Sequence, residues 1–176
     1  LTVNRLYGEI ELRFAEQVGL SPGEILEQLN RYVSLTLAKH SIFVTAVCFR
    51  VEPEAGLVRY ASAGHPPAFL RGVDGTVSEL GSTTFLLGAL KEGFVSNERT
   101  ARFEPGDSLV AYTDGATEAT TPSGKMLRVA GLRDLLVSSK PPAGDIAHRL
   151  AAAVVGHREG LPPADDTLIV EIFSPI

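Results

Sequence analysis

The chain has 176 residues, of which 44% are hydrophobic and 21% charged, so it is long enough for one domain with a sizeable core and is not a disordered segment. Its formal net charge of −5 argues against a general nucleic-acid binder. No apolar run reaches the roughly 18 residues that a membrane-spanning helix needs and no signal peptide is evident, so a cytoplasmic protein that is not membrane-bound is expected.

The N-terminal part of the chain has the apolar spacing of two helices. Apolar side chains recur every three or four residues over residues 1–18 and again over residues 21–39. Ser21 and Glu24 predict the start of the second helix, because they have the spacing of a capping box. The first helix has no cap before it. We therefore expect residues 1–176 to form a single domain that is N-terminally incomplete.

Runs of β-forming residues separated by turn residues predict a series of strands after these helices. The first two are expected to form a hairpin, and Cys48 within the first is expected to be a small core residue. One cysteine allows no disulfide within the chain and no cysteine-rich zinc site. A loop is predicted over residues 81–93. The predicted strands cover residues 41–51, 57–62, 68–71, 77–80 and 94–103.

The C-terminal part predicts another strand, two helices and a last strand. The strands are expected at residues 107–112 and 167–173, and the helices at residues 129–139 and 145–157. Strands linked by hairpins and followed by helices indicate an α+β layered domain. The sheet is expected to be mostly antiparallel, or divided into two sheets in a sandwich with helices outside.

A pair of acids follows the strand at residues 107–112. The strand ends on Asp114, and Gly115 then allows the chain to turn away because it has no Cβ. Glu118 follows four residues after Asp114 and would lie on the same side of a helical turn. Two hard oxygen ligands on a rigid backbone suit Mg²⁺ or Mn²⁺. The alternative is that Asp114 only caps the turn after the strand.

A second acidic pair stands immediately before the last strand. Asp165 and Asp166 are adjacent, and their carboxylates repel each other unless a cation or hydrogen-bond donors lie between them. The alternative is a solvated acidic turn. Two strands with acids at their ends nevertheless fit a carboxylate metal cluster.

Three segments carry a resemblance to a known family. In this order they resemble the bacterial SpoIIE-type branch of the metal-dependent protein serine/threonine phosphatases, the PPM family, and the resemblance covers essentially the whole chain. Residues 61–67 read Ala-Ser-Ala-Gly-His-Pro-Pro, residues 112–119 read Tyr-Thr-Asp-Gly-Ala-Thr-Glu-Ala, and residues 165–170 read Asp-Asp-Thr-Leu-Ile-Val.

The resemblance implies a fold and an activity. The fold is an α-β-β-α sandwich, with two packed, mostly antiparallel sheets flanked by helix pairs and a site for two Mn²⁺ or Mg²⁺ ions between the sheets. The activity is hydrolysis of phosphoserine or phosphothreonine on a protein, in this branch typically a small anti-sigma-factor antagonist. An upstream sensor domain is often present. Water activated by the metals is the nucleophile, in agreement with the absence of a Cys-x5-Arg motif.

The resemblance also implies roles for individual residues. Asp114 matches the metal-binding Asp of the family's Asp-Gly motif, and Asp165 matches a ligand of the same metal. Asp166 would be a near-site or substrate-positioning group. Glu118 matches a position that helps to hold a third, weaker metal in some relatives. His65 is expected to have a structural part in a tight turn rather than a chemical one.

One departure leaves the activity of this chain open. The family has an earlier Gly-Asp motif on a strand before the first helix, and no such motif precedes Leu1. N-terminal strands that are missing from the sequence are the favoured explanation. The alternatives are a non-catalytic regulatory or binding relative, and a metallohydrolase of small phosphoesters. The helix pair at residues 6–39 could form a switch or homodimer surface, as in relatives, or serve core packing alone.

Overall fold

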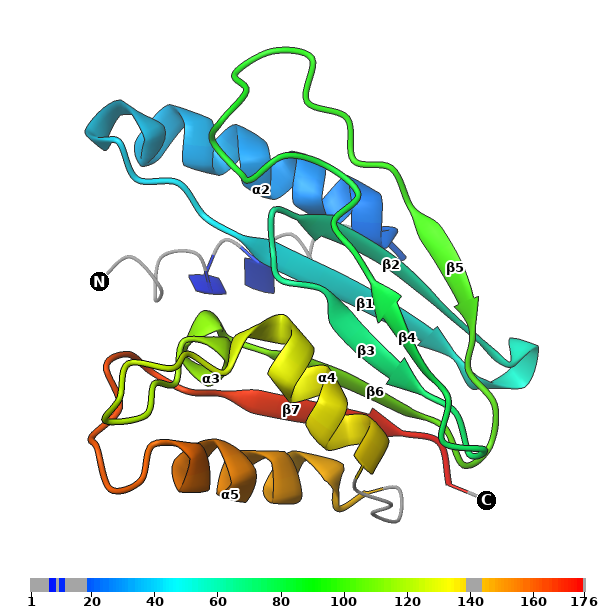
Figure 1. The fold of residues 1–176 in the computed structure, drawn as a ribbon. Coiled ribbons are helices and arrows are strands. Elements are labelled where there is room, and N and C mark those ends of the chain that lie inside the picture. The colour runs from blue at the N-terminus through cyan, green and yellow to red at the C-terminus, as the bar shows by residue number, and fades with distance from the viewer. Residues whose placement is uncertain (1–6, 9, 12–18, 139–143, 176) are drawn as a thin grey trace. The chain divides into compact units, whose positions relative to one another are not determined.

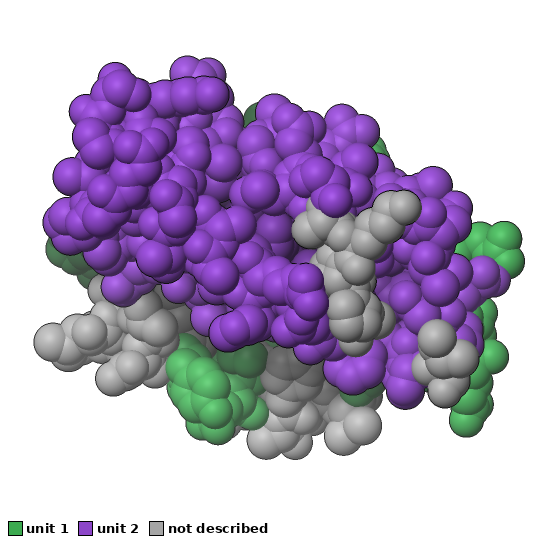
Figure 2. Space-filling model, turned by 60° about the horizontal axis from the view of Figure 1, so that its bottom comes forward, with its two compact units in different colours: residues 1–65, 82–102 green, residues 66–81, 103–176 purple. Residues whose placement is uncertain are grey.

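The computed structural model describes residues 7–8, 10–11, 19–138 and 144–175. These residues fall into two compact units, which Figure 2 shows in green and purple. The first unit comprises residues 1–65 and 82–102, and the second comprises residues 66–81 and 103–176. Most of the predicted first helix lies outside the described residues. No helix among the described residues is long and apolar enough to cross a membrane.

The first unit is a three-stranded antiparallel sheet with a helix on one face (Figure 1). Helix α2 has the predicted capping box: the Ser21 hydroxyl accepts from the Glu24 amide, and the Glu24 carboxylate accepts from the Ser21 amide. The hairpin is confirmed, with Ala46 opposite Ala63 and Glu52 opposite Leu57. The elements are α2 (Pro22–Thr36), a 3₁₀ turn (Ala38–His40), β1 (Ala46–Glu52), a 3₁₀ turn (Pro53–Ala55), β2 (Leu57–Ala63) and β5 (Arg99–Arg102).

The core of this unit lies between α2 and the hairpin. Leu26 and Val33 of the helix pack with Ala61 and Ala63 of β2. Cys48 is half-buried against this cluster, as expected of a small core residue. Burial and the negative charge of Glu98 raise the pKa of its thiol to about 11, so the thiol stays protonated near neutral pH.

The second unit is a four-stranded antiparallel sheet in the order β4-β3-β6-β7. Strand β6 is central and pairs with β3 on one side and with β7 on the other, although β7 lies about 60 residues later in the chain. The short helix α3 follows β6 directly. The elements are β3 (Ala68–Arg71), β4 (Val77–Leu80), β6 (Ser108–Tyr112), α3 (Asp114–Thr117), α4 (Arg128–Ser138), α5 (Ile146–His157) and β7 (Ile169–Phe173).

Helices α4 and α5 cover one face of this sheet (Figure 1). Alternation along β6 turns Val110 and Tyr112 toward the helices. The buried core joins these side chains to the two helices and fixes the strand that leads to Asp114. Its largest members are Phe69, Val110, Tyr112, Leu132, Leu136, Ile146, Leu150 and Val154.

An α+β fold with two antiparallel sheets confirms the predicted fold class, but several strands are shorter than predicted. The first begins at Ala46 rather than at residue 41. Two of the other differences have a visible cause. The segment before Arg99 is bound by side chains, since the Ser96 amide donates to the Glu27 carboxylate at 3.1 Å. The last strand begins at Ile169 because the amide of Leu168 donates to the Thr113 hydroxyl at 2.9 Å. In both places a backbone amide donates to a side chain instead of to a neighbouring strand.

Tyr112 places a polar hydroxyl in this core. Burial raises the pKa of its phenol, and among the described residues the buried hydroxyl has no hydrogen-bond partner. Tyr112→Phe is therefore expected to raise the free energy of unfolding by about 1 kcal/mol, because it removes an unpaired buried polar atom. Urea denaturation followed by circular dichroism measures the change. A loss of stability in Tyr112→Phe would contradict the absence of a partner.

Candidate functional site

The candidate site begins where β6 ends. Asp114 is the first residue of α3, and the Glu118 amide donates to the Asp114 carbonyl at 2.8 Å. The two acids are therefore one helical turn apart, as predicted, and both are exposed. One carboxylate oxygen of Asp114 accepts from the Gly115 amide at 3.0 Å. This is the turn-capping role that the sequence left open, and it leaves the second oxygen available to a ligand.

Gly115 lets the second acidic segment lie directly against the first. A Cβ at this position would lie 2.5 Å from the Asp166 carbonyl oxygen and 3.1 Å from that of Asp165. The first distance is closer than real Cβ contacts allow, and the second is tighter than most of them. The glycine is needed for this close approach of two backbones as well as for the turn.

Thr113 fastens the same two segments together. Its hydroxyl donates to the Asp166 carbonyl at 2.9 Å and accepts from the Leu168 amide at 2.9 Å. Its amide donates to the Leu168 carbonyl at 3.0 Å. The segments that carry Asp114 and Asp165 are therefore joined through their backbones at the ends of β6 and β7.

Arg158, at the end of α5, is part of this site and was not predicted. Its side chain reaches the place where the Asp114 and Asp165 segments meet, which we call the junction, and only 7% of the residue is exposed. The Nη2 atom donates to the Gly115 carbonyl at 3.2 Å and to the Thr167 hydroxyl at 2.6 Å. Nothing in the local sequence distinguishes this arginine from a surface arginine that ends an alanine-rich helix.

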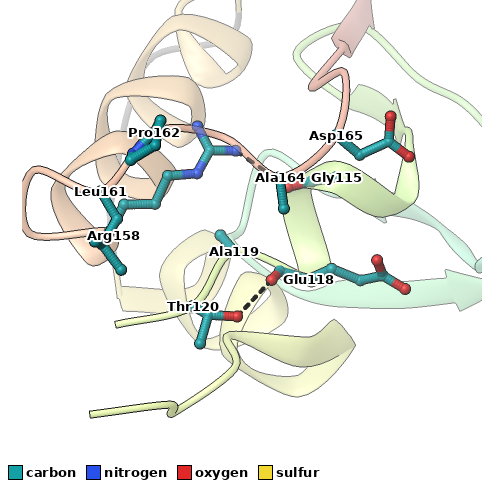
Figure 3. A pocket seen from close by; sticks show the side chains of 9 residues that line it. All are labelled: Gly115, Glu118, Ala119, Thr120, Arg158, Leu161, Pro162, Ala164 and Asp165. Atoms are coloured by element: carbon teal, nitrogen blue, oxygen red, sulfur yellow. Dashed lines mark hydrogen bonds between the residues drawn. The ribbon is translucent and has the colours of Figure 1, made fainter. Parts of the chain in front are cut away.

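A small pocket of about 130 Å³ lies beside the junction (Figure 3). The side chains of Glu118 and Asp165 extend to the same side of the view, whereas the Arg158 guanidinium reaches toward Gly115 from the other. Apolar parts of Ala119 and Leu161 also line the pocket. It therefore combines carboxylates, one cation and apolar walls in a small space.

The oxygen ligands available at this site are of the type that hard divalent cations prefer. Asp114, Glu118 and Asp165 offer carboxylate oxygens on two fastened segments. In the part of the chain that the structure describes, no group of three or more His, Cys, Asp or Glu side chains is placed to hold a metal ion. One oxygen of Asp165 accepts from the Asp166 amide at 2.7 Å, which keeps the two adjacent acids in a defined turn. Their metal-binding roles stay predictions.

His65 belongs to the first unit, outside the pocket at Gly115. The preceding Gly64 has a φ of 62°, and its amide donates to the Ser82 hydroxyl at 2.9 Å. These features are those of a tight turn, and the structural role expected of His65 stays a prediction.

Gly115→Ala tests the close approach of the two segments. The new Cβ is expected to displace the loop at Asp165 and Asp166 by about 1 Å and to lower metal-dependent activity about 100-fold. Gly156→Ala is the matched control, because no atom lies within 4 Å of a Cβ there. Phosphate release measures both variants. Equal activity in Gly115→Ala and the native protein would show that the approach does not matter.

Comparisons with known proteins identify the family of the chain. The model of the family described as Stage II sporulation protein E (SpoIIE) matches residues 9–172. The phosphoserine phosphatase RsbU of Bacillus subtilis is 30% identical over 113 residues, which are 64% of this chain and 33% of RsbU. The curated relatives that match are longer proteins, of which the chain spans 23%, 33% and 37%.

Two solved structures share the fold at low sequence identity. The SiaA-PP2C domain of Pseudomonas aeruginosa has a TM-score of 0.80 at 18% identity, with 96% of this chain and 67% of that chain covered. RsbX, solved in complex with magnesium, has a TM-score of 0.67 at 16% identity, with 96% of this chain and 71% of RsbX covered. At these identities the likeness establishes the fold alone.

Proposed function

The chain belongs to the SpoIIE family, and on this premise we propose that it is a metal-dependent phosphatase that hydrolyses phosphoserine or phosphothreonine on a protein. One observation carries the proposal: the acid-bearing segments at Asp114 and Asp165 are pressed together at Gly115 and fastened by Thr113. If Asp114 only capped the turn after β6, neither the close approach at Gly115 nor the hydrogen bonds of Thr113 to the Asp165 segment would be needed.

Each residue of the junction has a role in this proposal. Asp114 and Asp165 would hold Mn²⁺ or Mg²⁺ through their free oxygens, and Glu118 would add a weaker donor. The metal, when bound, supplies Lewis-acid stabilisation of phosphoryl oxygens and lowers the pKa of a water molecule. Asp166 would position the substrate, and the apolar parts of Ala119 and Leu161 would limit access of bulk water.

The proposed substrate is a phosphorylated regulatory protein, in particular an anti-sigma-factor antagonist. The naming of RsbU as a phosphoserine phosphatase supports the chemistry, and the resemblance to the SpoIIE-type branch supports the class of substrate. Asp114, Glu118 and Asp165 are exposed, so a side chain on the surface of another protein could reach them. A sensor domain and a homodimer through the helices before residue 40 would supply regulation.

Hydrolysis of a phosphoserine-bearing antagonist protein tests the proposal. The full-length native protein is assayed with Mn²⁺ and with an excess of chelator. Release of phosphate only with Mn²⁺ is the expected result. Binding of the phosphoprotein without turnover would instead identify a non-catalytic relative. Faster release from p-nitrophenyl phosphate than from the phosphoprotein would identify a hydrolase of small phosphoesters.

A further inference from the structure

We propose that Arg158 is a positioning residue that holds the Asp114 and Asp165 segments in the arrangement that binds the metal. The inference rests on the proposed function and deepens it. Arg158 itself has no group that binds a metal ion. Its proposed role is to set the distance between Asp114 and Asp165, whose carboxylates are proposed to do so.

A single nitrogen atom of Arg158 connects the two acidic segments. Nη2 donates to the carbonyl of Gly115, the residue after Asp114, and to the hydroxyl of Thr167, which lies two residues after Asp165. The Thr167 hydroxyl is itself 3.4 Å from the Asp165 carbonyl oxygen. A third element, the end of α5, thereby holds the ends of β6 and β7 together.

Burial and charge make this connection strong. Hydrogen bonds from a guanidinium are stronger than those between neutral groups, and the planar group fixes the direction of each bond. A buried charged group is costly unless it is hydrogen-bonded, so the guanidinium of this buried residue needs oxygen acceptors. No carboxylate among the described residues forms an ion pair with it.

Helix α5 does not need the Arg158 guanidinium to stay on the sheet. Ile146, Leu150 and Val154 are each at most 2% exposed and attach the helix to the core. Glu171 of β7 binds the other end of the helix through the Ile146 amide at 2.9 Å. The bonds of Arg158 are directed to the site rather than to the packing of its own helix.

Four variants and one control test the inference in the full-length native protein. Arg158→Met keeps the apolar stem and removes all donors, and Arg158→Lys keeps the charge without the fork. Thr167→Val removes the accepting hydroxyl, and Thr167→Ser keeps it. Arg149→Met is the control, because Arg149 is exposed on the same helix and its one ion pair among the described residues is with the nearby Asp145. Mn²⁺ affinity, amide hydrogen exchange of the metal-free protein, and the kinetic constants are measured.

The expected result is a loss of Mn²⁺ affinity of about tenfold or more in Arg158→Met and a smaller loss in Thr167→Val. Amide exchange should rise over residues 113–118 and 165–168 and stay unchanged in β3. For the phosphoprotein, kcat at a fixed Mn²⁺ concentration should fall while KM stays the same. Thr167→Ser and Arg149→Met should match the native protein, and Arg158→Lys should be intermediate.

The outcomes separate this inference from the proposed function. If the native protein binds Mn²⁺ and both Arg158→Met and Thr167→Val keep its affinity and exchange pattern, the role of Arg158 is wrong and the function stands. If the native protein binds no Mn²⁺, the metal-dependent function is wrong and the inference falls with it. If Arg158→Met does not fold, Thr167→Val decides, since Thr167 is exposed and its replacement leaves the core intact.

Discussion

Asp114→Asn is expected to lower Mn²⁺-dependent phosphate release by about 1000-fold or more. A bound metal supplies several kcal/mol of transition-state stabilisation, and each ~1.4 kcal/mol changes the rate about tenfold. Asparagine has the shape of aspartate, and its Oδ1 can still accept from the Gly115 amide. The turn should therefore persist while the charge that is proposed to bind the cation is lost. Steady-state phosphate release from the phosphoprotein measures the effect.

Asp134→Asn is the matched control for Asp114→Asn. Asp134 is exposed on α4, and the removal of its charge should leave the rate within about twofold of the native value. Native activity in Asp114→Asn would exclude this carboxylate as a metal ligand. Equal losses in both variants would point to a general effect of net charge instead.

Glu171→Ala is expected to cause the largest loss of stability, about 3 kcal/mol or more. The Glu171 carboxylate lies on β7 and accepts four hydrogen bonds, three of them from amides at the start of α5. Asp145, the N-cap residue of α5, forms no side-chain capping bond. Glu171 caps the helix instead, from strand β7. Removal leaves three partly buried donors, the Ser108 hydroxyl and the Ile146 and Ala147 amides, without this acceptor, each at a cost of roughly 1 kcal/mol. The distances are 2.8 Å to Ser108, 2.7 Å to Gly144, 2.9 Å to Ile146 and 3.2 Å to Ala147.

Thermal and urea unfolding measure the loss. For a chain of this length, a loss of 3 kcal/mol should lower Tm by roughly 6–12 °C. Glu171→Gln should lie between the native protein and Glu171→Ala, because one oxygen acceptor remains. Glu54→Ala, an exposed acid in the 3₁₀ turn after β1, is the control and should change Tm by less than about 2 °C. A Tm of Glu171→Ala equal to that of this control would contradict the capping role.

Local patterns predicted most of the secondary structure. Strands β3 and β4 were predicted with the observed bounds, because turn residues stand on both sides of each short run. The capping box at Ser21 was also predicted, since it depends only on residues three apart. Features that depend only on neighbours in the sequence can thus be predicted from the sequence alone.

Features that depend on long-range partners were not predicted. Glu171 is the one charged residue of an otherwise apolar strand, and nothing in its local sequence indicates that it caps a helix. Arg158 looks like an ordinary helix-ending arginine, and only the folded chain brings Gly115 and Thr167 to it. Acids at the ends of two strands predicted a shared metal site, whereas the hydrogen bonds by which Thr113 joins the two segments were not predicted.

Mn²⁺ titration of the isotope-labelled protein, followed by NMR, tests whether Asp114 and Asp165 share a metal site. Mn²⁺ is paramagnetic and broadens the amide signals of residues close to where it binds. Signals of residues 114–118 and 165–167 are expected to broaden first and together, and this effect should be lost in Asp114→Asn. Broadening that begins elsewhere, or that affects only one of the two segments, would contradict a metal site shared by Asp114 and Asp165.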